Sequence, residues 1–192
     1  MKPLFAKLAI FFCCGVIFYG CSVAAATKPP RTGELMPAVE LPVPKSDVWR
    51  HYLGINREAG RFALQDIDAD ILVIEIFSMY CPYCQREAPQ VNHLYDIITM
   101  TPELKDRVKI IGIGASNSTY EVNFFKDQYK VPFPLFPDPD LSIHRKLGSV
   151  RTPYFFVIRR LADGTRKIIY SKVGSIGEPQ LFLDKVTRKV GR

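Results

Sequence analysis

The stretch "EIFSMYCPYCQREAP", residues 75–89, determines how this sequence is interpreted. It contains Cys81 and Cys84, which are separated by two residues and lie between an apolar run and a helix-forming one. The preceding run, "ILVIEIFS" at residues 71–78, is rich in β-branched residues and predicts a central parallel strand buried on both faces. From residue 82 to about residue 99 the pattern predicts a helix. The cysteine pair is therefore expected where a buried strand ends and a helix begins.

A cysteine at the mouth of a helix is well placed for redox chemistry. If Cys81 lies there, with Pro82 in the first turn, unpaired backbone N–H groups and the positive end of the helix dipole face its sulfur. That environment lowers the pKa of a thiol, and the thiolate is the form that attacks disulfides. Cys84, one turn further along, is then placed to attack the mixed disulfide and release the substrate. A C-x-x-C sequence beside a β-α unit therefore predicts a redox pair.

Other uses of the pair fit the sequence poorly. A structural zinc site needs four ligands, and no second cysteine pair follows the N-terminal segment. A haem attachment site would need histidine at position 85, which holds Gln85, and the histidines are scattered at His51, His93 and His144. A disulfide that encloses two residues restricts the unfolded chain very little, so a structural staple is also disfavoured. We expect neither a metal nor another bound cofactor.

The remainder of the chain predicts alternating strands and helices followed by a hairpin. The expected elements are a short strand in residues 61–67, a strand at 107–116, a helix at 119–130, a strand and turn at 133–140, a short helix capped by Asp140 and ended by Gly148, hairpin strands at 153–160 and 166–173, and a last helix starting near residue 178. Residues 46–60 give no clear signal. This order indicates an α/β fold, with a largely parallel sheet covered by helices and antiparallel strands added by the C-terminal hairpin.

The N-terminal segment has the features of an export signal. Lys2 and Lys7 precede residues 8–26, an uncharged and largely apolar run, and cleavage after Ala26 would fit the small-residue rule. Two alternatives remain open, because Gly20-Cys21-Ser22 resembles the end of a lipoprotein signal and the uncharged run is about long enough to span a bilayer. All three predict an exported, periplasmic protein, which in the last two cases is lipid-anchored or tethered to the membrane.

One domain and a moderate positive charge are expected for the rest of the chain. Residues 27–45 are rich in proline and predict a linker with an extended lead into a domain at residues 33–190. The net charge is +7, and without residues 1–26 it becomes +5, because two lysines and no acids are removed (24 basic minus 19 acidic residues). The basic residues are spread out and form no basic-aromatic stripe, so nucleic acid is not an expected partner.

Several matched positions bring a family resemblance. Glu87 and Pro89 complete a C-x-x-C-x-x-E-x-P pattern, Glu75 lies six residues before Cys81, and Thr152-Pro153 precedes a predicted strand. Together with "VPFPLFPDPDLSIHRKLG" at residues 131–148, these features resemble thioredoxin-fold proteins, in particular exported thiol–disulfide oxidoreductases of the TlpA/ResA type, which are similar to AhpC/TSA redoxins. The resemblance covers about residues 33–190. It implies a thioredoxin-like three-layer α/β/α sandwich with a mixed sheet.

The resemblance also assigns expected roles. It makes Thr152-Pro153 a cis-proline loop that faces the cysteines, and Thr152, Pro153 and Tyr83 candidates for contact with substrate. Pro82 and Glu87 would tune the cysteines. Glu75 would be a buried acid, and because burial raises the pKa of a carboxyl group, it could take the proton from Cys84.

Some positions depart from the family pattern, so alternatives remain. Tyr80 replaces the tryptophan that many thioredoxins have before the first cysteine, and Pro82-Tyr83 between the cysteines resembles glutaredoxins. These residues influence the reduction potential, so the direction of electron flow is open. We expect an exported reductase of protein disulfides; the alternatives are a disulfide donor or isomerase, a thiol peroxidase, and a binding module without enzymatic activity. Ile74 disfavours the peroxidase, since it replaces a proline of the peroxiredoxin nucleophile segment.

The expected partners follow from this function. They are substrate proteins with disulfides or thiols, among which apocytochrome c is suggested by family analogy alone. A thiol–disulfide electron donor at the membrane would regenerate the reduced pair. The protein is expected to be a monomer.

Overall fold

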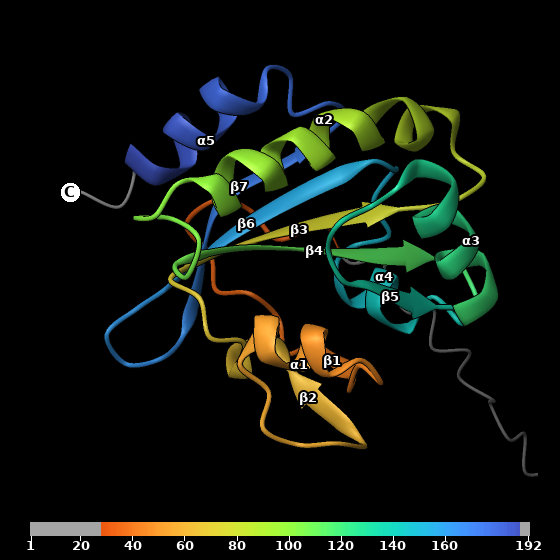
Figure 1. Cartoon of the computed structure of the whole chain (residues 1–192), viewed down its shortest axis with the longest axis horizontal. Helices are drawn as coiled ribbons and strands as arrows, with labels where there is room; N and C mark the ends of the chain where they lie inside the picture. Colours follow the sequence, from red (N-terminus) through yellow and green to blue (C-terminus); the bar gives the residue numbers. More distant parts are fainter. Residues whose placement is uncertain (1–27, 189–192) are drawn as a thin grey trace, which may run out of the picture.

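A five-stranded mixed sheet forms the centre of the structure, a computed structural model that describes residues 28–188 (Figure 1). Its strands are β3 (Ile71–Phe77), β4 (Val108–Ala115), β5 (Leu135–Asp138), β6 (Tyr154–Arg160) and β7 (Arg166–Val173), in the spatial order β5-β4-β3-β6-β7. β3, β4 and β5 are parallel, whereas β6 is antiparallel to β3 and β7 is antiparallel to β6. The predicted α/β fold with a C-terminal antiparallel hairpin is confirmed.

One face of the sheet is covered by three helices. These are α2 (Pro82–Met100), α3 (Thr119–Tyr129) and α5 (Pro179–Arg188), and α2 and α5 lie side by side in Figure 1. Their buried side chains, such as Val91, Phe125 and Phe182, pack with Val73 of β3 and Phe155 of β6 in one apolar cluster. The predicted helices at residues 82–99 and 119–130 thus form, because their apolar stripes face this side of the sheet.

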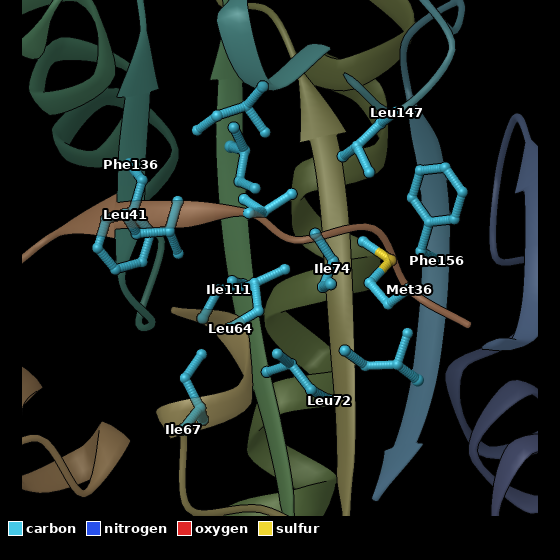
Figure 2. Packing of buried hydrophobic residues seen from close by; sticks show 14 of the residues in the cluster. Met36, Leu41, Leu64, Ile67, Leu72, Ile74, Ile111, Phe136, Leu147 and Phe156 are labelled. Atoms are coloured by element: carbon cyan, nitrogen blue, oxygen red, sulfur yellow. The ribbon is translucent and has the colours of Figure 1, made fainter. Parts of the chain in front are cut away.

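The other face is covered mainly by the N-terminal part of the domain. This layer contains β1 (Glu40–Pro42), α1 (Asp47–Leu53), β2 (Arg61–Ala63), the 3-10 turn η1 (Leu64–Asp66) and the later helix α4 (Ser142–Lys146). Figure 2 shows side chains of this layer, among them Leu41 and Leu64, packed over Leu72, Ile74 and Ile111 of the sheet. Consecutive residues of β3 therefore supply the two cores alternately, as the period of a strand requires.

Three local expectations differ from the structure. The possible strand at residues 61–67 is only β2, followed by η1, and α1 lies in the region that gave no signal. Asp140 does not cap α4 as expected. Instead the buried Asp138 accepts hydrogen bonds from the backbone N–H groups of Ile143 at 3.0 Å and His144 at 2.8 Å, while Asp140 accepts one from Ser142 N–H at 3.2 Å. Asp138 ends β5, which brings its carboxylate under the first turn of the helix.

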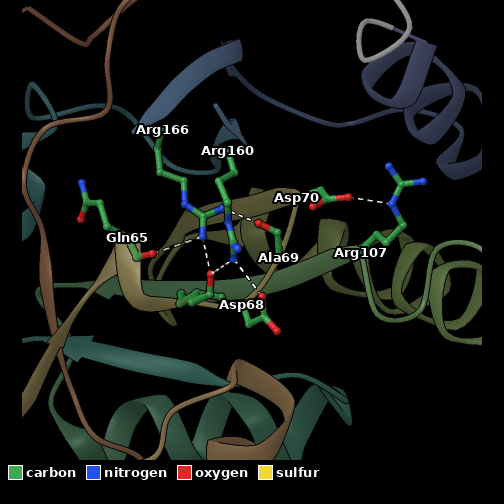
Figure 3. Close-up of polar contacts among 8 residues, drawn as sticks. Gln65, Asp68, Ala69, Asp70, Arg107, Arg160 and Arg166 are labelled. Carbon is green, nitrogen blue, oxygen red and sulfur yellow. Dashed lines mark hydrogen bonds and ion pairs between the residues drawn. The ribbon is translucent and has the colours of Figure 1, made fainter. Parts of the chain in front are cut away.

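The end of the sheet where β3 begins is held by a buried arginine (Figure 3). Arg166 is 1% exposed, and its guanidinium donates hydrogen bonds to the carbonyl oxygens of Ala69, at 2.6 Å, and Ile67. Burial, followed by the nearby positive charge of Arg160, lowers the pKa of Arg166 to about 10. These bonds tie the loop before β3 to the β6–β7 hairpin, because they give a donor to the buried carbonyl of Ala69 and a second donor, beside Arg160, to that of Ile67.

The export segment predicted at residues 1–26 lies outside the described residues. Within residues 28–188, no helix combines the length and apolar character needed to cross a membrane.

Candidate active site

The first cysteine lies at the mouth of α2. Cys81 is the N-cap residue of this helix, Pro82 occupies its first turn, and the Cys81 side chain is partly exposed. Its Sγ lies 3.3 Å from the carbonyl oxygen of Thr152, across from the helix. Proline suits this place because the first turn of a helix leaves its N–H groups without intrahelical acceptors. A partner molecule can therefore reach Cys81 at the surface between α2 and the loop before β6.

The two cysteines, both free thiols, are in contrasting environments. Cys84 is 0% exposed, and burial together with the charge of Glu75 raises its pKa. Partial burial also acts against ionisation of Cys81, but its pKa is nevertheless lowered. Hydrogen bonds outweigh the burial, and they come from the Thr152 side chain, from the backbone and thiol of Cys84, and from the Tyr83 backbone. Of the two thiols, Cys81 is the one suited to attack as a thiolate.

Glu75 lies inside the sheet and is oriented towards the side of α2. It is 2% exposed, and it alternates along β3 with Ile74 and Ile76, whose side chains belong to the opposite core. Burial, the charge of Glu87 and the charge of Cys81 raise the pKa of Glu75 to about 8. Its Oε1 atom has no hydrogen-bond partner among the described residues. The carboxyl group is thus available to exchange a proton near neutral pH.

Glu87 connects α2 with the loop after β7. It is buried, and its Oε1 accepts hydrogen bonds from Ile176 N–H at 2.7 Å and from the Ser175 hydroxyl at 3.0 Å. The charge of Glu87 contributes to the raised pKa of Glu75, so the predicted influence of Glu87 on the cysteines would act through Glu75. Its direct contacts fix the position of the loop beside the site.

A groove runs beside Cys81, and the predicted substrate-contact residues line it. Tyr83 from α2 and Thr152 and Pro153 from the loop before β6 lie in the wall of a space of about 410 Å³. The Thr152–Pro153 peptide bond is cis, and the Pro153 carbonyl accepts a hydrogen bond from Gly174 N–H at 2.8 Å. Tyr83 is 66% exposed. The structure thus brings these three residues together next to the partly exposed thiol.

The segment before Cys81 is held by two residues that the sequence reasoning did not assign to the site. Asn117 is fully buried, and its Oδ1 accepts a hydrogen bond from Met79 N–H at 2.9 Å. Gln85 donates from Nε2 to the Met79 carbonyl at 2.8 Å. The position of Asn117, two residues after the end of β4, was the available signal, because loops at the carboxyl ends of parallel strands meet at one edge of the sheet.

Nothing in the described part of the chain gathers the ligands of a metal site. Between residues 28 and 188, no three His, Cys, Asp or Glu side chains lie close enough together to hold an ion.

Solved structures share this fold. A thiol:disulfide interchange protein DsbE from Chlorobium tepidum, described as putative in its published name, aligns with a TM-score of 0.60 and 17% identity, over 84% of this chain and 99% of its own. StoA from Bacillus subtilis aligns with a TM-score of 0.51 and 20% identity, over 66% and 89% of the two chains. At these identities the likeness establishes the thioredoxin-like fold.

The amino-acid sequence has relatives as well. Thiol-disulfide oxidoreductase ResA of Bacillus thuringiensis subsp. konkukian is 29% identical over 140 residues, which are 71% of this chain and 75% of ResA. ResA of Halalkalibacterium halodurans is 29% identical over 102 residues, 53% of this chain and 54% of that protein. The family model described as the AhpC/TSA family matches residues 32–168, which include the whole candidate site up to Pro153 and β6. Since this match covers well over half of the sequence, the chain belongs to the AhpC/TSA family.

Proposed function

We propose that this thiol–disulfide oxidoreductase acts as a reductase of protein disulfides, through Cys81 as the attacking thiol and Cys84 as the resolving thiol. The observation that carries the proposal is the contrast between the two thiols: Cys81 is partly exposed and has a lowered pKa, whereas Cys84 is fully buried and has a raised one. The named activity of the ResA relatives supports the same reaction class.

The reaction would proceed in two exchanges. The Cys81 thiolate attacks one sulfur of a substrate disulfide, a Cys81–substrate disulfide forms, and the other substrate sulfur leaves as a thiolate that takes up a proton. Cys84 then loses its proton and attacks the Cys81 sulfur, so a Cys81–Cys84 disulfide forms and the second substrate thiol is released. Two electrons pass from the protein to the substrate.

Glu75 is the proposed proton acceptor for the second exchange. The pKa of Cys84 is raised by burial and by Glu75, so this thiol needs a base to become a nucleophile. The pKa of Glu75, at about 8, lies close enough to neutrality for a carboxylate fraction to be present in the reduced protein. The rate of the second exchange should therefore rise with pH through this region.

The direction of electron flow is tested by the reduction potential of the pair in residues 27–192. Stabilisation of the reduced pair as a thiolate makes its disulfide more oxidising; such stabilisation acts on Cys81, whose pKa is lowered, and not on Cys84, whose pKa is raised, so the measured potential decides the direction. A reductase should have a potential near or below about −250 mV, whereas a value near about −120 mV would make the protein a disulfide donor. The absence of a reversible two-electron transition would instead favour a binding module.

The assignment of the two cysteines is tested by trapping. A Cys84→Ser variant should accumulate mixed disulfides with substrate proteins through Cys81, because the second exchange is blocked. The matched Cys81→Ser variant keeps the buried thiol and should trap none. Equal trapping by both variants would contradict the proposed roles.

Export and regeneration complete the proposal. The chain would act outside the cytoplasm after export through its N-terminal segment, with or without a lipid or membrane tether. A membrane protein carrying a dithiol would then reduce the Cys81–Cys84 disulfide.

A further inference from the structure

The groove beside Cys81 carries positive charge on both of its sides. Arg86 lines it from α2 and Arg151 from the loop before β6. Both side chains are exposed, and neither forms an ion pair with a carboxylate of the described chain. By contrast, five arginines elsewhere in residues 28–188 do pair with Asp or Glu, namely Arg50, Arg57, Arg61, Arg107 and Arg160. Two guanidinium groups thus line one groove without an ion pair to a carboxylate of residues 28–188, and they outnumber the single carboxylate of the lining, that of Glu87.

The acidic residue in the lining, Glu87, is held by the loop after β7 rather than by either arginine. Glu87 is buried, and its Oε1 accepts two hydrogen bonds from the loop after β7, from Ser175 and Ile176. The Arg86 guanidinium lies 4.6 Å from the centre of the Tyr83 ring, so the ring holds it beside the groove without occupying its hydrogen-bond donors. A ligand that brings its own carboxylate therefore finds donors available for charge-assisted hydrogen bonds.

The groove is also continuous with the reacting sulfur. Arg151 directly precedes Thr152, whose carbonyl oxygen lies 3.3 Å from Cys81 Sγ. The apolar surfaces of Tyr83, Pro153 and Val173 line the groove as well, which suits the backbone and side chains of an extended peptide. Arg86 lies five residues after Cys81 on α2, which is about 7.5 Å along the helix axis at 1.5 Å per residue. Since an extended chain advances about 3.3 Å per residue, a side chain that reaches the arginines lies within about three residues of a cysteine bound to Cys81.

We propose that this groove selects protein substrates that carry an aspartate or glutamate within about three residues of the reacting cysteine. The proposal rests on the function proposed above, because it concerns the partner that forms the mixed disulfide with Cys81. Arg86 and Arg151 act as specificity-determining residues, and they favour an acidic flank over a basic one by charge complementarity.

The test measures how fast the reduced protein consumes three peptide disulfides. Each peptide carries one cysteine as a mixed disulfide with neutral 2-thiopyridine, and the peptides differ only in having Glu, Gln or Lys two residues from that cysteine. Reaction with the dithiol protein yields the peptide thiol, 2-thiopyridone and the oxidised Cys81–Cys84 pair, and the absorbance of 2-thiopyridone reports the second-order rate constant. We expect the order Glu, then Gln, then Lys, with about a tenfold ratio between the extremes at low salt and a smaller ratio at high salt.

Matched variants separate local recognition from the overall positive charge. A double variant, Arg86→Gln with Arg151→Gln, should reduce the Glu-to-Lys ratio to nearly one. Arg61→Gln with Arg107→Gln removes the same charge from exposed ion pairs away from the groove and should keep the ratio. The charge reversal Arg86→Glu with Arg151→Glu should reverse the order of the three rate constants. Misfolding cannot explain such a result, because a misfolded protein would not react faster with the lysine peptide.

The outcomes distinguish this inference from the proposed function. If the wild-type protein reduces none of the peptides, the reductase function fails. Two results would leave the reductase function standing and overturn the selection of acidic flanks. One is that the wild-type protein reduces all three peptides at the same rate. The other is that the Glu-to-Lys ratio of rate constants is unchanged in the glutamine double variant and in the glutamate double variant.

Discussion

The substitution Glu75→Gln should stabilise the protein, by an amount that increases with pH. Burial raises the pKa of Glu75 from its ordinary value of 4.5 to about 8. Between these values the folded protein keeps a proton that the unfolded chain releases, so the free energy of unfolding falls as pH rises. The stability due to the neutral carboxyl group is complete below about pH 4.5 and is lost as pH approaches and passes about 8. Glutamine has a similar shape and no charge, so it avoids this loss.

The magnitude follows from the size of the pKa shift. One pKa unit corresponds to about 1.36 kcal/mol, which is also the loss per pH unit over most of the window. Between about pH 5 and about pH 8, with the slope decreasing near each pKa, the wild-type protein should lose about 3.5 kcal/mol relative to the variant.

The assay is urea unfolding at several pH values between about 5 and 9, followed by the fluorescence of Trp49, the single tryptophan of the chain. Both proteins carry Cys81→Ser, so that titration of the Cys81 thiol adds nothing to the pH dependence; because the charge of Cys81 is the smallest of the three causes of the raised pKa of Glu75, the expected loss in this background is somewhat below that figure. Glu103→Gln, at an exposed position, serves as the control and should follow the wild-type curve. A stability difference between Glu75→Gln and wild type that stays constant from pH 5 to pH 8 would refute the argument that a buried carboxyl group titrates there.

Three further outcomes are expected. Asn117→Ala leaves the part-buried Met79 N–H without its acceptor and should lower the free energy of unfolding by about 1 kcal/mol, whereas Asn123→Ala, at an exposed position of α3, should lower it little; equal losses in urea unfolding would speak against the hydrogen bond. Arg166→Ala should cost about 3 kcal/mol, because it removes a buried side chain and takes away the donor to the buried Ala69 carbonyl. Arg107→Ala, which removes an exposed ion pair, should cost about 0.5 kcal/mol, and similar values for both would contradict the role given to burial. The rate of alkylation of Cys81 by iodoacetamide should rise with pH around a midpoint below the ordinary thiol pKa of about 8.5, and Cys84 should stay unreactive in the folded protein. Mass spectrometry after limited reaction identifies the alkylated cysteine, and alkylation of Cys84 before Cys81 would contradict this expectation.

The parts of the fold that depend on local patterns could be predicted from the sequence. The apolar run that becomes β3 is buried on both faces, and such a run has few alternatives in an α/β chain. Asp163-Gly164 between two strand patterns predicted the β6–β7 hairpin, which forms. The cysteine pair after β3 and before α2 was likewise a local pattern. In each case the signal lies within one or two adjacent elements.

The parts that were missed depend on contacts between distant segments. α1 has seven residues and buries mainly Leu53, so it shows no hydrophobic period. Asn117 gains its role only because Met79, 38 residues earlier, approaches it at the end of the sheet. Arg166 stands at the start of a strand, where an arginine normally faces solvent, and only the position of the loop before β3 encloses it. The choice of Asp138 over Asp140 as the cap of α4 depends on where β5 ends, which residue patterns do not fix to one residue.

The gradient of burial from Cys81 to Glu75 explains why the two cysteines could not exchange roles. Only Cys81 is within reach of a folded partner protein, so an attack between molecules must start there. Cys84 is enclosed by the apolar cluster under α2 and can react only with a sulfur that is already held at Cys81. Glu75, in the strand behind it, meets neither substrate nor bulk water, so its proton exchange would be coupled to Cys84. The same burial that makes Glu75 costly for stability at alkaline pH thus supports the proposal that it serves the second exchange.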